Sequence, residues 1–241
     1  CYLELSILYS PNYSQENEIS IKYSKKSIEA YKKCNNPTGE AKACQILGNT
    51  YIQLEDYKNS NIFLKKSIGL LKKTENINEI IMGFLSISVL NSNFLKHHLA
   101  KDNINKAYDI LKVNKNKNYI FNKITILRWE SFYYHRMGDF ENTLKSLYKS
   151  LHLGKEKYEE DNFQIIVLNS LSISDAKFIM GDYRNAFKYL NEGIELLEKE
   201  NSALHLFYNI YKLARIHMYL KEYNQSLKCF QKADKLIQDL D

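Results

Sequence analysis

Residues 43–57 read ACQILGNTYIQLEDY, and this stretch decides the fold. An apolar period of helical spacing, Leu47-Gly48-x-x-Tyr51, is followed at once by the polar signature Glu55-Asp56-Tyr57. Residues three or four apart lie on one face of a helix. The stretch therefore predicts a helix that packs through one face and ends in a tight turn.

The same turn signature recurs along the chain. Its middle residues fall at 56, 103, 139, 182 and 222, which gives steps of 47, 36, 43 and 40 residues. The four further copies are Asp102-Asn103-Ile104, Gly138-Asp139-Phe140, Gly181-Asp182-Tyr183 and Lys221-Glu222-Tyr223. This periodicity predicts a row of helical hairpins, each with a first helix (A helix), a turn and a second helix (B helix).

Small side chains follow each turn at two positions seven residues apart. They are Ser60 and Ser67, Ala107 and Asn114, Thr143 and Ser150, Ala186 and Gly193, and Ser226 and Ala233, with Asn114 as the exception. Ser20 and Ser27 fit the same frame and make six units. Small residues two turns apart let a neighbouring helix approach closely, and one hairpin cannot bury both of its faces alone. We expect A helices near 1–9, 38–54, 78–99, 119–136, 161–179 and 203–219, and B helices near 17–33, 57–73, 103–113, 140–157, 183–199 and 223–239.

These residues resemble the tetratricopeptide repeat (TPR) family, whose Leu-Gly-x-x-Tyr core appears within residues 43–57. The resemblance implies an all-α, TPR-like α-solenoid, a right-handed superhelix of about six hairpins. The steps between turns average about 41 residues and exceed the standard ~34. The family's proline between repeats is absent apart from Pro37. Longer helices of this kind are a trait of the TPR-like regions of bacterial transcription regulators and peptide sensors.

Composition excludes several other classes of protein. Only 8 glycines and 2 prolines occur in 241 residues, too few turn-formers for an all-β fold. The longest apolar run, 80–90, is shorter than the ~20 residues that span a bilayer, and no signal peptide is visible.

The net charge of +6 is only mildly basic and, with acidic residues interspersed, argues against direct nucleic-acid binding. The four cysteines form no CxxC pair, so a reducing compartment, the cytoplasm, is expected.

We expect one repeat domain over residues 1–241, excised from a longer protein. Cys1 is then a boundary of that domain, although a mature lipoprotein also begins with cysteine. The sequence carries no nucleotide-binding, zinc-protease or serine-hydrolase motif. We therefore expect no catalytic residue, no metal and no cofactor.

Several single features have structural explanations. His98 and His217 occupy positions that resemble the core tyrosine of the repeat, and Trp129 favours core packing. Glu159-Glu160-Asp161 would cap an A helix. Four lysine doublets, Lys25-Lys26, Lys32-Lys33, Lys65-Lys66 and Lys72-Lys73, should lie solvated on B helices.

The A helices of TPR arrays line the concave groove, and the resemblance implies which side chains project there. The predicted partner-binding groove consists of Lys42, Gln45, Asn49, Lys96, Arg128, Phe132, His135, Asp175, Tyr208, Tyr211 and Arg215. The lining is basic and aromatic, so the predicted partner is a protein or peptide of acidic character. Ser92, Phe178 and Tyr219 belong to the same face in this register. The alternatives are solvated side chains without a ligand, or a structural scaffold that forms a homodimer through its terminal repeats.

Overall fold

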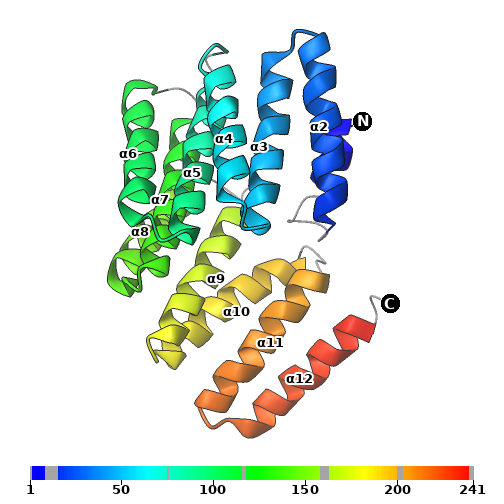
Figure 1. Cartoon of the computed structure of the whole chain (residues 1–241). Helices are drawn as coiled ribbons and strands as arrows, with labels where there is room; N and C mark the ends of the chain where they lie inside the picture. The colour runs from blue at the N-terminus through cyan, green and yellow to red at the C-terminus, as the bar shows by residue number, and fades with distance from the viewer. Residues whose placement is uncertain are drawn as a thin grey trace. The chain divides into compact units, whose positions relative to one another are not determined.

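The computed structural model describes residues 2–8, 16–74, 76–115, 118–157, 163–199 and 203–238, and these form twelve α-helices and no strand (Figure 1). The helices are α1 (Tyr2–Leu8), α2 (Asn17–Lys33), α3 (Pro37–Gln53), α4 (Tyr57–Leu71), α5 (Ile77–Asn93), α6 (His97–Val113), α7 (Tyr119–Arg136), α8 (Phe140–Lys157), α9 (Phe163–Ile179), α10 (Tyr183–Lys199), α11 (Ala203–Tyr219) and α12 (Tyr223–Gln238). The predicted all-α repeat fold is confirmed. The predicted roles of Cys1 and of Glu159-Glu160-Asp161 concern positions outside the described residues.

The chain forms two compact units, Cys1–Trp129 and Glu130–Asp241, whose boundary falls inside α7. In each unit, A helices pack against the B helix of their own hairpin and of the preceding one. Thus α3 packs on α4 and α2, and α11 packs on α12 and α10. Odd-numbered helices are therefore the A helices and even-numbered helices the B helices.

Three B helices begin at an aspartate that caps the helix. Asp56 accepts a hydrogen bond from the backbone N–H of Asn59 at 3.0 Å, and the Asn59 side-chain amide donates to the same carboxylate at 2.6 Å. Asp139 forms the same pair of bonds with Asn142, at 3.0 and 2.7 Å. A side-chain oxygen at this position satisfies an N–H that has no partner in the helix. These bonds stabilise the carboxylates, so the pKa values of Asp56 and Asp139 are lowered.

The turns inside the hairpins require left-handed backbone. Gly138 and Gly181 adopt φ of 73° and 78°, the region that favours glycine. Glu55, Leu95 and Lys221 take the same conformation without being glycine, at φ of 56°, 57° and 62°. Each turn residue is followed directly by the N-cap of the B helix.

The third turn lies elsewhere than predicted. Residues 102–104 are inside α6, and the turn is formed by Phe94, Leu95 and Lys96. The predicted helices 78–99 and 103–113 are accordingly wrong at their shared border. With Lys96 as N-cap, the caps fall at 56, 96, 139, 182 and 222, and the steps become 40, 43, 43 and 40.

This corrected register removes the exception among the small residues. Ala100 and Ala107 now stand four and eleven residues after the cap, as Ser60 and Ser67 do, and Asn114 leaves the pattern. Ala100, Ile104 and Ala107 are each 0% exposed. The error also explains His98, which was predicted to be in the core and instead lies exposed in the first turn of α6.

Serine supplies many of the small positions in the interfaces. Ser20, Ser24, Ser27, Ser60 and Ser67 on α2 and α4 are all buried. Leu64 lies between the two serines of α4 and is 0% exposed. The helices thus approach through hydroxymethyl groups and enclose one large apolar side chain.

The structure also tests the predictions for the lysine doublets, His217 and Trp129. The eight doublet lysines are exposed on α2 and α4 or just beyond their ends, as expected. His217 is 8% exposed and packs against Phe187 at 5.2 Å between ring centroids, whereas Trp129 is half-buried. Within the described ranges, no helix is both long and apolar enough to cross a membrane.

Candidate functional site

The candidate site lies in the second unit, between the A helices α9 and α11. Lys212 Nζ on α11 donates to Asp175 Oδ2 on α9 at 2.9 Å. One helical turn later, the Arg215 guanidinium carbon lies 5.2 Å from the centre of the Phe178 ring. A cleft of about 60 Å³ between the two helices is lined by Ser174, Asp175, Phe178, Lys212, Arg215 and Ile216. A cleft of this size accepts one small side chain or a carboxylate rather than a complete cofactor.

Two tyrosine rings pack around Phe178, the aromatic residue that lines this cleft. Tyr219, in the last turn of α11, stacks on Tyr183 with ring centroids 4.7 Å apart. Both rings meet Phe178 edge to face, at 5.1 and 5.4 Å. Such contacts stabilise by about 0.5–1.5 kcal/mol each beyond the area they bury. They therefore hold the Phe178 ring, and with it the surface on which Arg215 rests.

One face of α11 presents both charges and aromatic rings to solvent. Tyr208, Lys212, Arg215 and Tyr219 are separated by four, three and four residues, so they share a face. Tyr208 is 58% exposed and Tyr219 is 53% exposed. We call these four residues the α11 stripe.

The charges of the cleft do not cancel. Asp175 and Lys212 form an ion pair and offset each other. Arg215 contacts the Phe178 ring and has no ion pair with any described residue. The cleft therefore carries one uncompensated guanidinium beside an apolar ring, a combination that suits an anionic group.

The predicted groove residues of the first unit are only partly accessible. Lys42 on α3 pairs with Glu79 on α5 at 3.3 Å, so its charge is already used between two A helices. Gln45 is 9% exposed, and little of its side chain can reach a ligand. Asn49 is half-buried on α3. Arg128 is half-buried on α7, and burial lowers its pKa.

Two predicted groove residues lie off the A helices' shared face because the third turn was misplaced. Lys96 stands at the N-terminus of α6, with its ammonium 3.4 Å from the centre of the Tyr57 ring. Ser92 is 1% exposed. In the corrected register, Leu85 and Val89 on α5 take the places, eleven and seven residues before the cap, that were assigned to Ser92 and Lys96.

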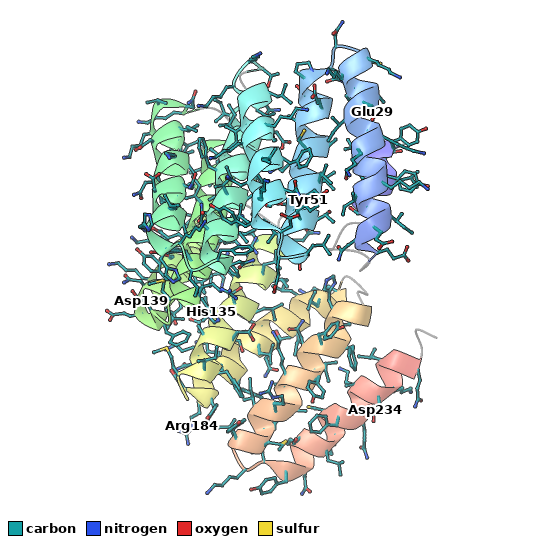
Figure 2. All side chains as sticks on the ribbon, viewed as in Figure 1. Glu29, Tyr51, His135, Asp139, Arg184 and Asp234 are labelled. Carbon is teal, nitrogen blue, oxygen red and sulfur yellow. The ribbon has the colours of Figure 1, made fainter. Side chains whose placement is uncertain are left out.

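In the second unit, some of the predicted groove residues line the cleft or are exposed, and others pack against aromatic rings of their own hairpin. Asp175 and Arg215 stand seven residues before the caps Asp182 and Glu222 and meet at the cleft. Phe132 has the equivalent position before Asp139 and is 37% exposed. His135 instead packs against Phe140 at 5.4 Å, beside the α7–α8 turn where Asp139 also lies (Figure 2). Tyr211 packs against Phe230 of its own hairpin at 5.4 Å.

Sequence reasoning missed Lys212 and Tyr183. Lys212 is detectable, because it stands three residues before Arg215 and shares its face. Tyr183 was read only as part of a turn signature, and nothing in its local sequence shows that its ring reaches the next A helix. No group of three or more potential metal ligands occurs in the parts of the chain that the structure describes.

The comparisons agree with this architecture. A family model for the tetratricopeptide repeat matches residues 41–72 and 209–240, so the chain contains TPR repeats at α3–α4 and α11–α12. No curated protein matches the sequence. Among solved structures, BtubC (BKLC) from P. vanneervenii superposes with a TM-score of 0.73 at 10% identity, over 93% of this chain and 92% of that one.

Two further solved structures share the fold over most of this chain. Aspartyl phosphate phosphatase F from Bacillus subtilis gives a TM-score of 0.71 at 16% identity, over 92% of this chain and 56% of that one. NprR in complex with its cognate peptide NprX gives 0.63 at 17% identity, over 96% and 65%. The chain thus spans only about half to two thirds of these two proteins. At such identities the likeness shows a shared fold.

Proposed function

We propose that this protein is a non-enzymatic interaction module that binds a peptide segment of acidic character on the A-helix face of its second unit. The observation that carries the proposal is the α9–α11 cleft, where Arg215 rests on Phe178 beside the Asp175–Lys212 ion pair. The proposed setting is the sensing or protein-interaction part of a bacterial regulatory protein in transcription or signalling.

The preference for an acidic segment follows from the uncompensated guanidinium. Arg215 can offer two parallel N–H groups to a carboxylate, and such a bidentate pair is shorter and stronger than a neutral hydrogen bond. The ring on one side of it limits hydration, which strengthens the attraction. A carboxylate of the peptide is disfavoured next to Asp175. Lys212 neutralises the charge of Asp175 and leaves no positive charge there for a second carboxylate.

The preference for a peptide follows from the α11 stripe. Tyr208 and Tyr219 are eleven residues apart, a distance of roughly 16 Å along a helix at 1.5 Å per residue. An extended segment of about five residues covers this length at ~3.3 Å per residue. Tyrosines supply contact area with little loss of conformational entropy, so they suit a ligand without a fixed fold.

The comparisons support the proposal at the level of the fold. NprR, which shares the fold, was solved with its cognate peptide. Three thiols of this chain, Cys34, Cys44 and Cys229, form no disulfide, which fits a protein of the reducing cytoplasm.

The test is a binding titration with labelled peptides. The probes are five-residue Asp/Glu-rich peptides with one Leu or Tyr, and the same peptides with Asn/Gln in place of Asp/Glu. We expect the acidic set to bind and Arg215→Ala to weaken its binding at least tenfold, with a loss of stability no larger than the ~0.5–1 kcal/mol of its contact with Phe178. Arg184→Ala is the control, because Arg184 is an exposed arginine on the B helix α10 (Figure 2).

Equal loss of binding in both variants would show attraction to the overall charge alone and would reject the cleft. No binding of any acidic peptide would favour the alternative, a scaffold without a groove ligand.

A further inference from the structure

The position three residues before each cap distinguishes the two A helices of the cleft from the others. On α3, α5 and α7 it holds the polar residues Gln53, Asn93 and Arg136, all of which are exposed. On α9 and α11 it holds Ile179 and Tyr219, which are 52% and 53% exposed. The position is exposed in all five of these hairpins, so burial within the repeat does not explain an isoleucine there. We call Ile179 and Tyr219 the apolar pair.

The apolar pair lies one helical turn from the cleft. Ile179 stands four residues after Asp175 on α9, so the two share a helix face. Tyr219 has the same relation to Arg215 on α11. Four residues rise by about 6 Å along a helix. The Phe178 ring contacts both Arg215, at 5.2 Å, and Tyr219, at 5.1 Å, and therefore borders the guanidinium as well as the apolar pair.

Exposed apolar side chains also occur toward the N-terminal ends of α9 and α11, but farther from the cleft. Leu168 on α9 is 42% exposed and stands seven residues before Asp175. Tyr208 on α11 is 58% exposed and stands seven residues before Arg215. Seven residues rise by about 10.5 Å along a helix.

An extended peptide can match one of these two distances. Its side chains on one side recur every two residues, about 6.6 Å apart. A residue three positions away covers about 10 Å, but its side chain points to the opposite side. The distance from Arg215 to the apolar pair therefore fits two neighbouring side chains on the same side of the peptide, and the distance to Leu168 and Tyr208 does not.

Resting on the proposed peptide binding, we infer that the apolar pair is a second subsite, which takes an apolar side chain two residues from the acidic residue bound by Arg215. The partner segment therefore carries an acidic and an apolar residue with one residue between them. An aliphatic side chain placed against Ile179 and Tyr219 removes apolar surface of both partners from water, which favours binding. The two subsites together require a spacing, which attraction to charge alone does not.

The experiment compares five-residue peptides of one composition, with one Glu, one Leu and three Ser. Their ends are blocked so that no terminal carboxylate takes part. Leu is placed one, two or three residues from Glu, on either side of it. We expect the spacing of two to bind about tenfold more tightly than the other spacings in one of the two chain orders. Fluorescence anisotropy of the labelled peptides measures the dissociation constants.

Two variants locate the subsite. Ile179→Gln introduces the residue type that Gln53 supplies at the same exposed position of α3, so the fold should tolerate it. It should abolish the preference for the spacing of two and leave the affinity for a Leu-free Glu peptide unchanged. Leu168→Gln is the matched control, because Leu168 is an exposed apolar residue toward the other end of the same helix. That variant should keep the preference.

Equal affinities at every spacing, with Arg215→Ala still weakening all of them, would overturn this inference and leave the proposed function in place. The inference would also fail if the preference persisted in Ile179→Gln, or if Leu168→Gln lost it to the same extent. A protein that binds no acidic peptide would reject the proposed function, and the second subsite with it.

Discussion

Gly48 on α3 lies directly against Leu64 on α4: a Cβ atom on Gly48 would stand 2.7 Å from the Leu64 Cγ and 3.3 Å from its backbone nitrogen. The apolar period that identified the fold contains this glycine because the two helices of the hairpin cross there. The close atoms are the backbone and side chain of one fully buried leucine, which leaves little room to adjust.

Replacing Gly48 by alanine should therefore destabilise the protein. Alanine gains up to about 1 kcal/mol in helix propensity, while overpacking a tight contact costs about 1–3 kcal/mol. We expect a net loss of up to about 2 kcal/mol in the free energy of unfolding, measured by urea denaturation. Gly69→Ala on α4 is the control, because nothing lies within 4 Å of its added Cβ. That variant should gain about 0.5–1 kcal/mol; equal effects in both variants would contradict this explanation.

Lys96 should matter for stability and not for peptide binding. Its ammonium lies over the Tyr57 ring at the third turn, so Lys96→Met keeps the stem and removes the cation–π contact, at a cost of about 0.5–1 kcal/mol. Lys65→Met, at an exposed position on α4, should have a smaller effect in the same thermal melts. A loss of peptide affinity in Lys96→Met with unchanged stability would instead return Lys96 to the groove.

Acid should weaken the helix caps. The pKa values of Asp56 and Asp139 are lowered by the Asn59 and Asn142 amides from the ordinary 3.8. Their contribution to stability is therefore complete above the unfolded value and is lost as the pH falls through the lower, folded values. Asp56→Asn with Asp139→Asn keeps an acceptor for the cap but removes the titration. Melting temperatures from about pH 2 to about pH 7 should then fall less steeply in acid than those of the parent protein. Asp109→Asn, within α6, should leave the acid slope of the parent unchanged.

The thiols should differ in reactivity. Cys34 is exposed after α2, whereas Cys44 is 0% exposed and burial raises its pKa to about 11. At about pH 8, iodoacetamide should modify Cys34 in the folded protein and leave Cys44 intact until denaturant is added, because the thiolate is the reactive form. Peptide mass spectrometry measures both sites in one sample. Modification of Cys44 at the rate of Cys34 would show that the α3–α4 hairpin opens readily.

The sequence predicts a turn correctly where the residue types show what the turn needs, such as glycine for a left-handed φ or aspartate for a helix cap. Gly181 supplies a left-handed φ, and Asp182 then caps α10, so both signals stand together. Leu95 adopts a left-handed φ of 57° without being glycine, and Lys96 caps α6 with no side-chain hydrogen bond. Asp102 and Asn103 form a polar pair that resembles the turn signature, so the third turn was predicted there. That wrong position led to the assignment of Lys96 and Ser92 to the groove.

The candidate site was predictable only in part for a related reason. The TPR resemblance implies which A-helix positions face the groove, and Asp175 and Arg215, each seven residues before a cap, were assigned from it. That Lys212 pairs with Asp175, or that Tyr183 stacks on Tyr219, depends on how neighbouring hairpins are placed against each other. No pattern within one repeat records this placement.

The serines buried on α2 and α4 bear on what happens when the protein is partly unfolded. A hairpin that separates from its neighbour uncovers these hydroxyl groups, which water solvates readily, together with large apolar side chains such as Leu64 on α4 and Leu85 on α5. Exposed apolar surface is what makes partly folded states aggregate. We therefore expect partly opened states of the first unit to associate, so that the fraction of protein recovered after heating and cooling should fall as the protein concentration rises.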